Sequence, residues 1–226
     1  MAQATLQTLD RGIEALLLIA RTPGGLKVGE LADHLALHRA VAYRIVSTLA
    51  GHGMVRRLED GRIVLGAAAF QLGAQASDSV RSQVRPILED LAERTGATAF
   101  LSMAEGEDCV VVQTVEPRQT MVTIHYRVGI RHPITRGAAG IAILAARPAR
   151  PDDPEEVRLA RAQGYSATRG QIHKGAVGVS SPVQLTGAGF AGMEYSIGVV
   201  ALETLDMETA CRAVPEAARA LSDRFA

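Results

Sequence analysis

One short segment of this chain, residues 39–50, constrains the fold and the function more than any other feature. Its apolar residues have the i, i+3, i+4, i+7 spacing of one helical face, namely Ala42, Ile45, Val46 and Leu49. A second stripe with this spacing lies about 160° around the helix axis, at 100° per residue, and consists of Ala40, Tyr43, Arg44 and Ser47. The apolar stripe must be buried, which leaves the second stripe exposed. Its guanidinium, phenol, hydroxyl and methyl groups are kinds that contact base edges in a DNA major groove.

Two helices are expected before this segment. Residues 5–21 end at a Pro-Gly-Gly sequence and carry an apolar stripe of helical spacing, made of Leu9, Ile13, Leu16, Leu17 and Ala20. Residues 28–35 predict a shorter helix with Val28, Leu31 and Leu35 inward. Gly51 or Gly53 suits the left-handed residue that commonly follows a helix, so one of them should end the third helix.

A hairpin is expected directly after the third helix. Residues 55–59 and 62–65 are strand-like and flank Asp60-Gly61, a pair that accepts positive φ at both positions and so predicts a two-residue turn. Three helices followed by a hairpin predict a winged helix-turn-helix over residues 1–66. Arginines on the hairpin, the wing, would then contact phosphates or the minor groove.

The predicted DNA-binding residues combine the exposed stripe with nearby basic groups. They are Lys27, Arg39, Ala40, Tyr43, Arg44, Ser47, Arg56, Arg57 and Arg62. We expect Tyr43 and Arg44 to contact bases, and the other basic side chains to contact phosphates. A polar helix face or a pair of arginines alone is typical of any solvated surface. The combination of both is what indicates DNA binding.

The composition argues against several other classes of protein. The 226 residues carry 24 basic and 24 acidic side chains, so no overall positive field indicates nucleic acid. An aromatic content of 4% without Trp counts against single-strand binding by base stacking. Two cysteines and six histidines without ligand spacing predict no disulfide framework and no metal. Because hydrolase and P-loop motifs are also missing, we expect no catalysis and no cofactor.

The chain shows no sign of membrane association. Charged residues interrupt the N-terminal segment where a signal peptide would need an apolar core. No run reaches the roughly 18 apolar residues that a membrane span requires. We therefore expect a cytoplasmic protein.

Several segments resemble, in order and spacing, the IclR family of bacterial transcription regulators. In the first 66 residues they are 8–13 (TLDRGI), 25–32 (GLKVGELA), 44–49 (RIVSTL) and 61–66 (GRIVLG). Further along they are 91–98 (LAERTGAT), 128–129 (VG), 133–134 (PI), 137–140 (GAAG), 164–165 (GY), Gly175 and 180–183 (SSPV). The ordered set spans nearly the whole chain.

Strands flanked by helices at both ends of the remaining chain predict an α+β fold. The resemblance implies that a linker helix over residues 67–84 follows the winged helix-turn-helix, and that residues 85–226 form a GAF-like effector-binding domain. In that domain the sequence predicts strands at 98–104, 109–116, 120–128, 176–185 and 189–200, and helices at 137–147 and 207–224. The last helix should turn Ala210, Val214, Ala217, Ala218 and Leu221 inward. The sequence departs from the family at Ala36, where Gly is commoner in the helix-turn-helix turn, at Thr135, where His is usual, at Ile141, where Lys or Arg is common, and in a shortened, Pro-rich segment before Gly164.

The candidate effector site begins at residues 137–140, where small residues open a predicted helix whose N–H groups and dipole favour an anion. Tight packing against a sheet would explain the same small residues. The resemblance favours a pocket and implies this set: Thr135, Gly137, Ala138, Ala139, Gly140, Thr168, Ala176, Gly178, Glu194 and Ser196. The nearby Arg127, Arg131 and Arg136 favour an anionic effector, whereas Glu194 opposes one, and both possibilities stay open.

We expect a sequence-specific transcription regulator, a repressor, that binds double-stranded operator DNA under the control of a small-molecule effector such as a small organic acid. It should form a homodimer or a dimer of dimers, because helix-turn-helix proteins commonly bind two half-sites. Two alternatives remain. One is a GAF-like redox enzyme that uses Cys109, although a cysteine in an apolar run is usually inert. The other is a winged helix that binds proteins.

Overall fold

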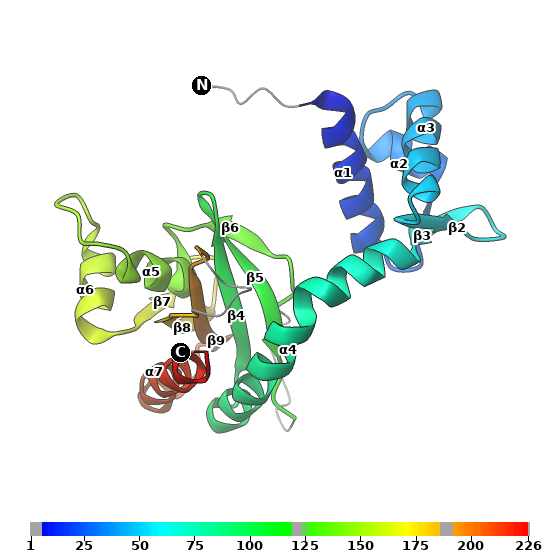
Figure 1. The fold of residues 1–226 in the computed structure, drawn as a ribbon. Helices are drawn as coiled ribbons and strands as arrows, with labels where there is room; N and C mark the ends of the chain where they lie inside the picture. The colour runs from blue at the N-terminus through cyan, green and yellow to red at the C-terminus, as the bar shows by residue number, and fades with distance from the viewer. Residues whose placement is uncertain (1–5, 119–123, 125, 186–191, 226) are drawn as a thin grey trace. The chain divides into compact units, whose positions relative to one another are not determined.

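The structure is a computed structural model that describes residues 6–118, 124, 126–185 and 192–225, without side chains at 74–81. The chain forms two compact units, residues 1–79 and 80–226 (Figure 1). The helix α4 (Ala67–Thr95) belongs to both of them. None of the described helices combines the length and the apolar character that crossing a membrane requires.

The N-terminal unit is the predicted winged helix-turn-helix. Its three helices pack around one apolar core with a small antiparallel sheet of strand order β1-β3-β2. The elements are α1 (Gln7–Arg21), β1 (Leu26–Lys27), α2 (Val28–His34), α3 (Arg39–Gly51), β2 (Val55–Arg57) and β3 (Arg62–Leu65). Gly53 has a φ of +67°, so the left-handed residue expected near the end of the third helix is present.

The apolar stripe of α1 is not its buried face. Ala15 and Ile19 are buried in the core of the unit, whereas Leu9, Ile13 and Leu17 remain about half exposed or more. Periodicity located the helix correctly, but it could not show which of two neighbouring apolar faces would contact α3. Leu9, Ile13 and Leu17 therefore form an apolar stripe on α1 that the core of the unit does not cover.

The hairpin turn differs from the two-residue turn that Asp60-Gly61 predicted. Within the loop 58–61 only Gly61 has a positive φ, of +83°. Gly61 N–H donates to the Leu58 carbonyl, and Leu58 N–H donates to that of Arg62. This is a longer loop with one left-handed glycine, and such a loop does not need positive φ at the aspartate.

The linker helix is longer than predicted, because α4 continues to Thr95 instead of ending at residue 84. Pro86 lies inside it. Proline lacks the N–H that would bond to the carbonyl four residues earlier, so it normally disfavours a helix interior. Here the burial of Val84, Leu88 and Leu91 against the C-terminal sheet offsets that loss.

The C-terminal unit is built on one six-stranded antiparallel sheet of order β6-β5-β4-β9-β8-β7. Helix α5 packs on one face, with α6 behind it, and α7 and the C-terminal part of α4 cover the other face (Figure 1). The elements are β4 (Thr98–Glu105), β5 (Asp108–Val115), β6 (Arg131–Pro133), α5 (Gly137–Ala146), α6 (Glu155–Gln163), β7 (Ser166–Arg169), β8 (Ala176–Val183), β9 (Tyr195–Leu202) and α7 (Met207–Arg224). The expected α+β fold is confirmed.

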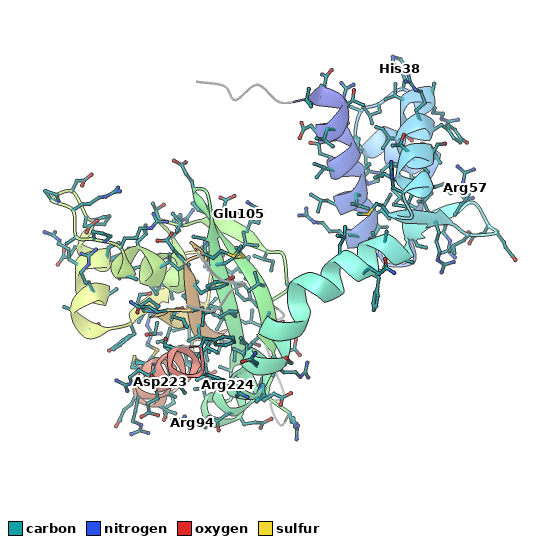
Figure 2. All side chains as sticks on the ribbon, viewed as in Figure 1. His38, Arg57, Arg94, Glu105, Asp223 and Arg224 are labelled. Carbon is teal, nitrogen blue, oxygen red and sulfur yellow. The ribbon has the colours of Figure 1, made fainter. Side chains whose placement is uncertain are left out.

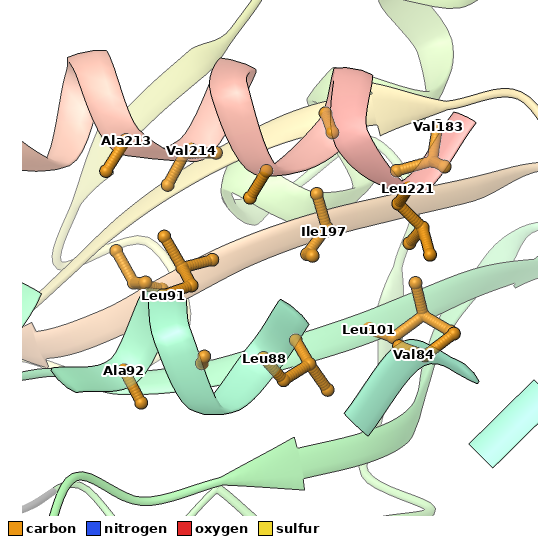
Figure 3. Close-up of a cluster of buried hydrophobic side chains, with 14 of the residues drawn as sticks. Val84, Leu88, Leu91, Ala92, Leu101, Val183, Ile197, Ala213, Val214 and Leu221 are labelled. Carbon is orange, nitrogen blue, oxygen red and sulfur yellow. The ribbon is translucent and has the colours of Figure 1, made fainter. Parts of the chain in front are cut away.

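Strand alternation sorts the side chains of the central strands between the two faces. Leu101 and Ile197 point toward α4 and α7, into the larger apolar core in Figure 3. Phe100 and Val200 point toward α5, into a second core. All five residues predicted to face inward on α7 are buried.

Two sequence predictions in this unit need correction. The predicted strand at 120–128 falls partly on residues 119–123 and 125, outside the described residues; its described remainder is not a strand, and β6 (Arg131–Pro133) pairs with β5 instead. The Pro-rich stretch before Gly164 holds more structure than expected. It contains α6, which ends on the left-handed Gly164.

Candidate functional site

The two stripes of α3 separate as predicted. Ala42, Ile45 and Val46 are buried in the core of the N-terminal unit, and Leu49 packs against it. Every residue of the second stripe is exposed: Ala40, Tyr43, Arg44 and Ser47. His38 precedes the helix with extended backbone angles, and Figure 2 labels it at one end of α3. We call Ala40, Tyr43, Ser47 and Arg57 the α3 outer face.

Arg57 joins the wing to α3, a contact that the sequence alone did not reveal. Its guanidinium carbon lies 5.7 Å from the centroid of the Tyr43 ring, a cation–π geometry. Because side chains alternate along a strand, Arg56 points to the opposite side of the wing. Of these two predicted arginines, only Arg57 is therefore brought to the α3 outer face.

Arg62 is held by the protein itself. Its Nε donates to the Asp60 carboxylate at 2.6 Å, and its Nη1 donates to the Gly24 carbonyl at 2.8 Å. The backbone N–H and the side chain of Arg62 both lower the pKa of Asp60. Arg62 thus ties the hairpin to the glycine turn before β1, which leaves less of its guanidinium for DNA.

The remaining predicted basic residues surround α2. Lys27 is exposed at the start of α2, where its backbone N–H donates to Glu30 Oε2 at 2.7 Å. Arg39 opens α3, and its guanidinium lies beside Gly29. Both side chains are exposed, as a phosphate contact would need.

Arg44 lies on the flank of α3 and lines a groove toward α1. This groove of about 750 Å³ is bounded by the first half of α1 and by α3. Its apolar walls include Leu9, Ile13 and Leu16 from α1. Tyr43 and Ser47 do not line this groove.

The turn between α2 and α3 contains a strained residue. Ala36 has a φ of +50°, so the substitution of Ala for the commoner Gly does fall at a left-handed position. A residue with a Cβ loses about 1 kcal/mol or more in that conformation.

A cavity of about 40 Å³ lies between α5 and the sheet in the C-terminal unit. Six of the ten predicted effector-binding residues line it: Gly137, Ala138, Ala139, Thr168, Ala176 and Gly178. The other lining residues were not singled out from the sequence: Phe100, Tyr126, His132, Gln171, Ile172, His173 and Val200. Phe100 and Tyr126 form an edge-to-face pair with centroids 5.2 Å apart.

Glycines shape this cavity in two different ways. A Cβ on Gly137, which has a φ of +77°, would lie 2.8 Å from Ile172 Cγ1 in the cavity wall. A Cβ on Gly140 would lie 2.2 Å from the carbonyl oxygen of Ile134, outside the cavity lining. The missing side chain of Gly137 thus leaves space in the cavity. The missing side chain of Gly140 lets α5 approach the backbone beside β6, which is the packing role considered above for these small residues.

Four predicted effector-binding residues do not line the cavity: Thr135, Gly140, Glu194 and Ser196. Thr135 is exposed in the turn after β6. Ser196 lies four residues before the lining residue Val200, or roughly 13 Å along a strand. Its hydroxyl is fully buried and has no hydrogen-bond partner among the described residues.

Glu194 is neutralised by a partner that the sequence did not indicate. Its carboxylate accepts hydrogen bonds from Nε and Nη2 of Arg147, at 2.8 and 2.6 Å. These bonds raise the pKa of Arg147. The conflict between Glu194 and an anionic effector is thereby removed, because the carboxylate is both paired and outside the cavity lining.

Two of the three arginines that were expected to favour an anion bind other groups of the protein. Arg131 pairs with Glu105 and Asp108 at the β4–β5 turn, and Arg136 donates to the backbone carbonyl of Gln171. None of the three lines the cavity. Any preference for an anion must therefore come from the start of α5 and from the polar side chains of the lining, His132 and His173 among them.

Cys109 is fully buried on β5. Burial raises the pKa of its thiol to about 12, so the thiolate is scarce at neutral pH. Redox chemistry by cysteine needs the thiolate, and this environment therefore counts against Cys109 as a reactive group. Among the described residues, no group of three His, Cys, Asp or Glu side chains is placed to hold a metal ion.

Comparison with known families bears on both units. The family model described as the IclR helix-turn-helix domain matches residues 8–59. A second, the bacterial transcriptional regulator IclR C-terminal model, matches residues 74–154, and together they cover more than half of the chain. The chain belongs to the IclR family. Its members in these comparisons are transcription regulators with a helix-turn-helix domain.

Individual relatives agree with this assignment. The transcriptional repressor IclR of Escherichia coli is 30% identical over 149 residues, which is 64% of this chain and 54% of that protein. The regulator BhcR of Paracoccus denitrificans is 27% identical and covers 96% of this chain and 86% of its own length. The chain spans about half the length of the first of these relatives.

Solved structures share the fold. An IclR transcriptional regulator from Alicyclobacillus acidocaldarius has a TM-score of 0.79 at 21% identity and covers 99% of this chain and 100% of its own. An IclR homologue from Microbacterium hydrocarbonoxydans, solved with 4-hydroxybenzoate, also has a TM-score of 0.79, at 20% identity, over 96% of this chain and 98% of its own.

Proposed function

We propose that this protein is a transcriptional repressor that binds double-stranded operator DNA through the α3 outer face. A small organic acid that binds in the C-terminal cavity controls its affinity for this DNA. A protein that acts on chromosomal DNA works in the cytoplasm, so we place it there. The observation that carries the DNA-binding proposal is the exposure of Tyr43 and Ser47 on a helix whose opposite stripe is fully used in the core.

The chemistry of this face suits a duplex. Tyr43 is about half exposed and Arg57 lies over its ring, so the pair joins the helix and the wing into one surface. A recognition helix in the major groove and a wing on the backbone would contact both kinds of DNA group. Lys27, Arg39 and Arg44 add exposed positive charge around it.

The salt dependence of binding tests this proposal. If half of the six basic side chains of each protomer contact phosphate in a dimer, about six counterions are released, and affinity falls roughly 10³-fold between 50 and 200 mM salt. Fluorescence anisotropy with a duplex from the upstream region of the protein's own gene measures this. A flat salt response, or equal affinity for an unrelated duplex, would contradict sequence-specific binding.

Self-association is part of the proposal. Leu9, Ile13 and Leu17 on α1, together with Leu6 just before it, are exposed and form an apolar surface of the N-terminal unit. We propose that a second copy covers it, because a symmetric dimer presents two recognition helices to two half-sites. Ile13→Glu should then shift the protein toward monomer in sedimentation analysis, while Gln71→Glu, at an exposed position of α4 outside the groove, should not.

The effector would bind in the cavity. Its supporting residues are the six predicted ones that line it, together with His132 and the aromatic pair Phe100 and Tyr126. The structural relative solved with 4-hydroxybenzoate has the same fold and favours an organic acid here as well. A regulator of this kind works through the differential affinity of the effector for two states of the protein.

A matched pair of glycine substitutions tests the cavity. Gly137→Val fills it, and Gly164→Val introduces the same side chain at the same backbone conformation, a φ of +78°, in open space at the end of α6. Thermal shift with a panel of organic acids should show stabilisation of the wild type and of Gly164→Val only. An unchanged response of Gly137→Val would exclude this cavity as the effector site.

A further inference from the structure

The loop between β7 and β8, residues 170–175, closes one side of the cavity. Gln171, Ile172 and His173 all line it. Ile172 packs over the first residue of α5, since it is the side chain that a Cβ on Gly137 would meet. The loop therefore covers the N-terminal end of α5, where a ligand would meet the helix.

Gln171 fixes this loop through both ends of its amide. Gly137 N–H donates to Gln171 Oε1 at 2.8 Å, and Gln171 Nε2 donates to Glu156 Oε1 at 2.9 Å. The orientation of the amide is set by its partners, because a backbone N–H can only donate and a carboxylate only accepts. An oxygen of the protein itself thus occupies the first N–H of α5.

Helix α6 holds α5 at both ends. Arg161 donates to the carbonyls of Leu144, Ala145 and Arg147 at the C-terminal end of α5. At the other end Glu156, also on α6, holds Gln171. A group that displaced Gln171 from Gly137 would therefore loosen one of the two attachments between these helices.

His132 adds a polar group to the cavity that the fold leaves unused. The side chain is 7% exposed and lines the cavity. Its Nδ1 meets the Pro133 carbonyl at 3.1 Å, so Nδ1 carries a proton, and in the neutral ring Nε2 is then an acceptor. Among the described residues Nε2 has no hydrogen-bond partner. The cavity thus combines an unmatched acceptor with apolar walls.

We propose that Gln171 is a placeholder for the effector: its amide oxygen occupies the position of a carboxylate oxygen on Gly137 N–H, and a small carboxylic acid must displace it to bind. The proposal rests on the proposed effector role of the cavity. The carboxylate takes over the hydrogen bond from Gly137, a hydroxyl on the acid can donate to His132 Nε2, and the apolar body lies against Phe100 and Val200.

The size of the cavity separates two kinds of acid. A volume of about 40 Å³ holds about three water molecules. Acetate is close to this size, so it can displace the Gln171 amide with little movement of the rest of the loop. Benzoate is larger, so its binding requires Gln171 and Ile172 to move away. The need to displace Gln171 should therefore weaken the binding of benzoate more than the binding of acetate.

Two substitutions at Gln171 have opposite expected effects. Gln171→Ala removes the placeholder, so the Gly137 amide should exchange with solvent about 5-fold faster, and benzoate should bind about 5-fold tighter, the equivalent of one hydrogen bond. Gln171→Glu combined with Glu156→Gln, which supplies the donor that a carboxylate at 171 would lack, keeps an oxygen on Gly137 N–H, so it should preserve the protection of that amide and weaken benzoate binding. Lys174→Ala, in the same loop but outside the cavity lining, is the control.

The experiment uses the full chain, with amide exchange followed by ¹⁵N NMR without ligand and binding of sodium benzoate, sodium acetate and neutral benzamide followed by calorimetry. Faster exchange together with tighter benzoate binding in Gln171→Ala supports the placeholder. Unchanged Gly137 exchange, or faster exchange without a gain in benzoate affinity, overturns it and leaves the effector role of the cavity standing. Should no organic acid bind the wild type or any variant, the effector role fails and the placeholder fails with it.

Discussion

The two candidate sites of this protein are built in opposite ways. The α3 outer face takes most of its residues from one helix, and its side chains are exposed. The cavity collects residues from both arms of the sheet, from the start of α5 and from the β7–β8 loop, and most of them are buried. The part of a site that lies on one exposed helix face follows from helical periodicity alone. A buried site that is assembled from distant segments follows only from the fold.

This difference explains what the sequence could predict. The two stripes of α3 need nothing beyond 100° per residue, and both are as expected. The contact of Arg57 with Tyr43 depends on how the hairpin packs against the helix, and no local pattern contains it. The exposed stripe of α1 was ambiguous for the same reason, since only the position of α3 decides that Ile19, and not Ile13, is buried.

In the C-terminal unit, resemblance to a family located the start of α5 but not the rest of the cavity. Phe100 and Val200 face it because β4 and β9 are paired in a particular register, which cannot be read from either strand alone. Gln171 belongs to the cavity because its side chain accepts a hydrogen bond from Gly137, a residue 34 positions away in the sequence. Glu194 was expected in the cavity, but Arg147 holds its carboxylate elsewhere.

The contrast between exposed and buried groups predicts its largest effect at Cys109, the buried thiol of the C-terminal unit. At pH 8 a thiol with a pKa of about 12 is about 10³-fold less ionised than an ordinary cysteine. Alkylation of Cys109 by iodoacetamide, followed by peptide mass spectrometry, should therefore be at least about 100-fold slower in the native protein than in denaturant. Raising the pH toward 12 should increase the native rate. Fast labelling at pH 8 would instead revive the redox alternative.

A smaller but still large effect is expected at Gly140, where α5 meets the backbone beside β6. A Cβ there would overlap the carbonyl oxygen of Ile134, so Gly140→Ala should destabilise the C-terminal unit by about 3 kcal/mol. Chemical denaturation measures the loss. Gly73→Ala is the control, since a Cβ at that position meets nothing. Equal stability of the two variants would show that the close approach of α5 is not required.

In the N-terminal unit, Arg57→Ala should weaken operator binding by about 1–2 kcal/mol, through loss of a phosphate contact and of the contact with Tyr43. Stability should change little, because the side chain is exposed. Arg118→Ala removes another exposed charge, from the C-terminal unit, and should leave binding unchanged. Fluorescence anisotropy measures the operator affinity of both variants. A similar loss of affinity in both would indicate a general effect of net charge instead of a defined binding surface.

The smallest expected effect concerns the left-handed Ala36. Ala36→Gly should stabilise the N-terminal unit by about 0.5–1 kcal/mol, because glycine adopts a φ of +50° without a clash. Ala40→Gly, four residues on and inside α3, should destabilise it by about 1 kcal/mol. Thermal unfolding with a probe in this unit compares the two. Changes of the same sign would mean that the backbone at Ala36 carries no strain.

The central claim, that the α3 outer face binds a duplex, is tested most directly by adding one negative charge to it. Ser47→Glu places a carboxylate on this face, and Gln71→Glu adds the same charge at an exposed position of α4 in the same unit. In anisotropy titrations with operator DNA at a fixed salt concentration, Ser47→Glu should reduce affinity by about 100-fold or more through like-charge repulsion, with Gln71→Glu close to the wild type. Full affinity of Ser47→Glu would contradict the account.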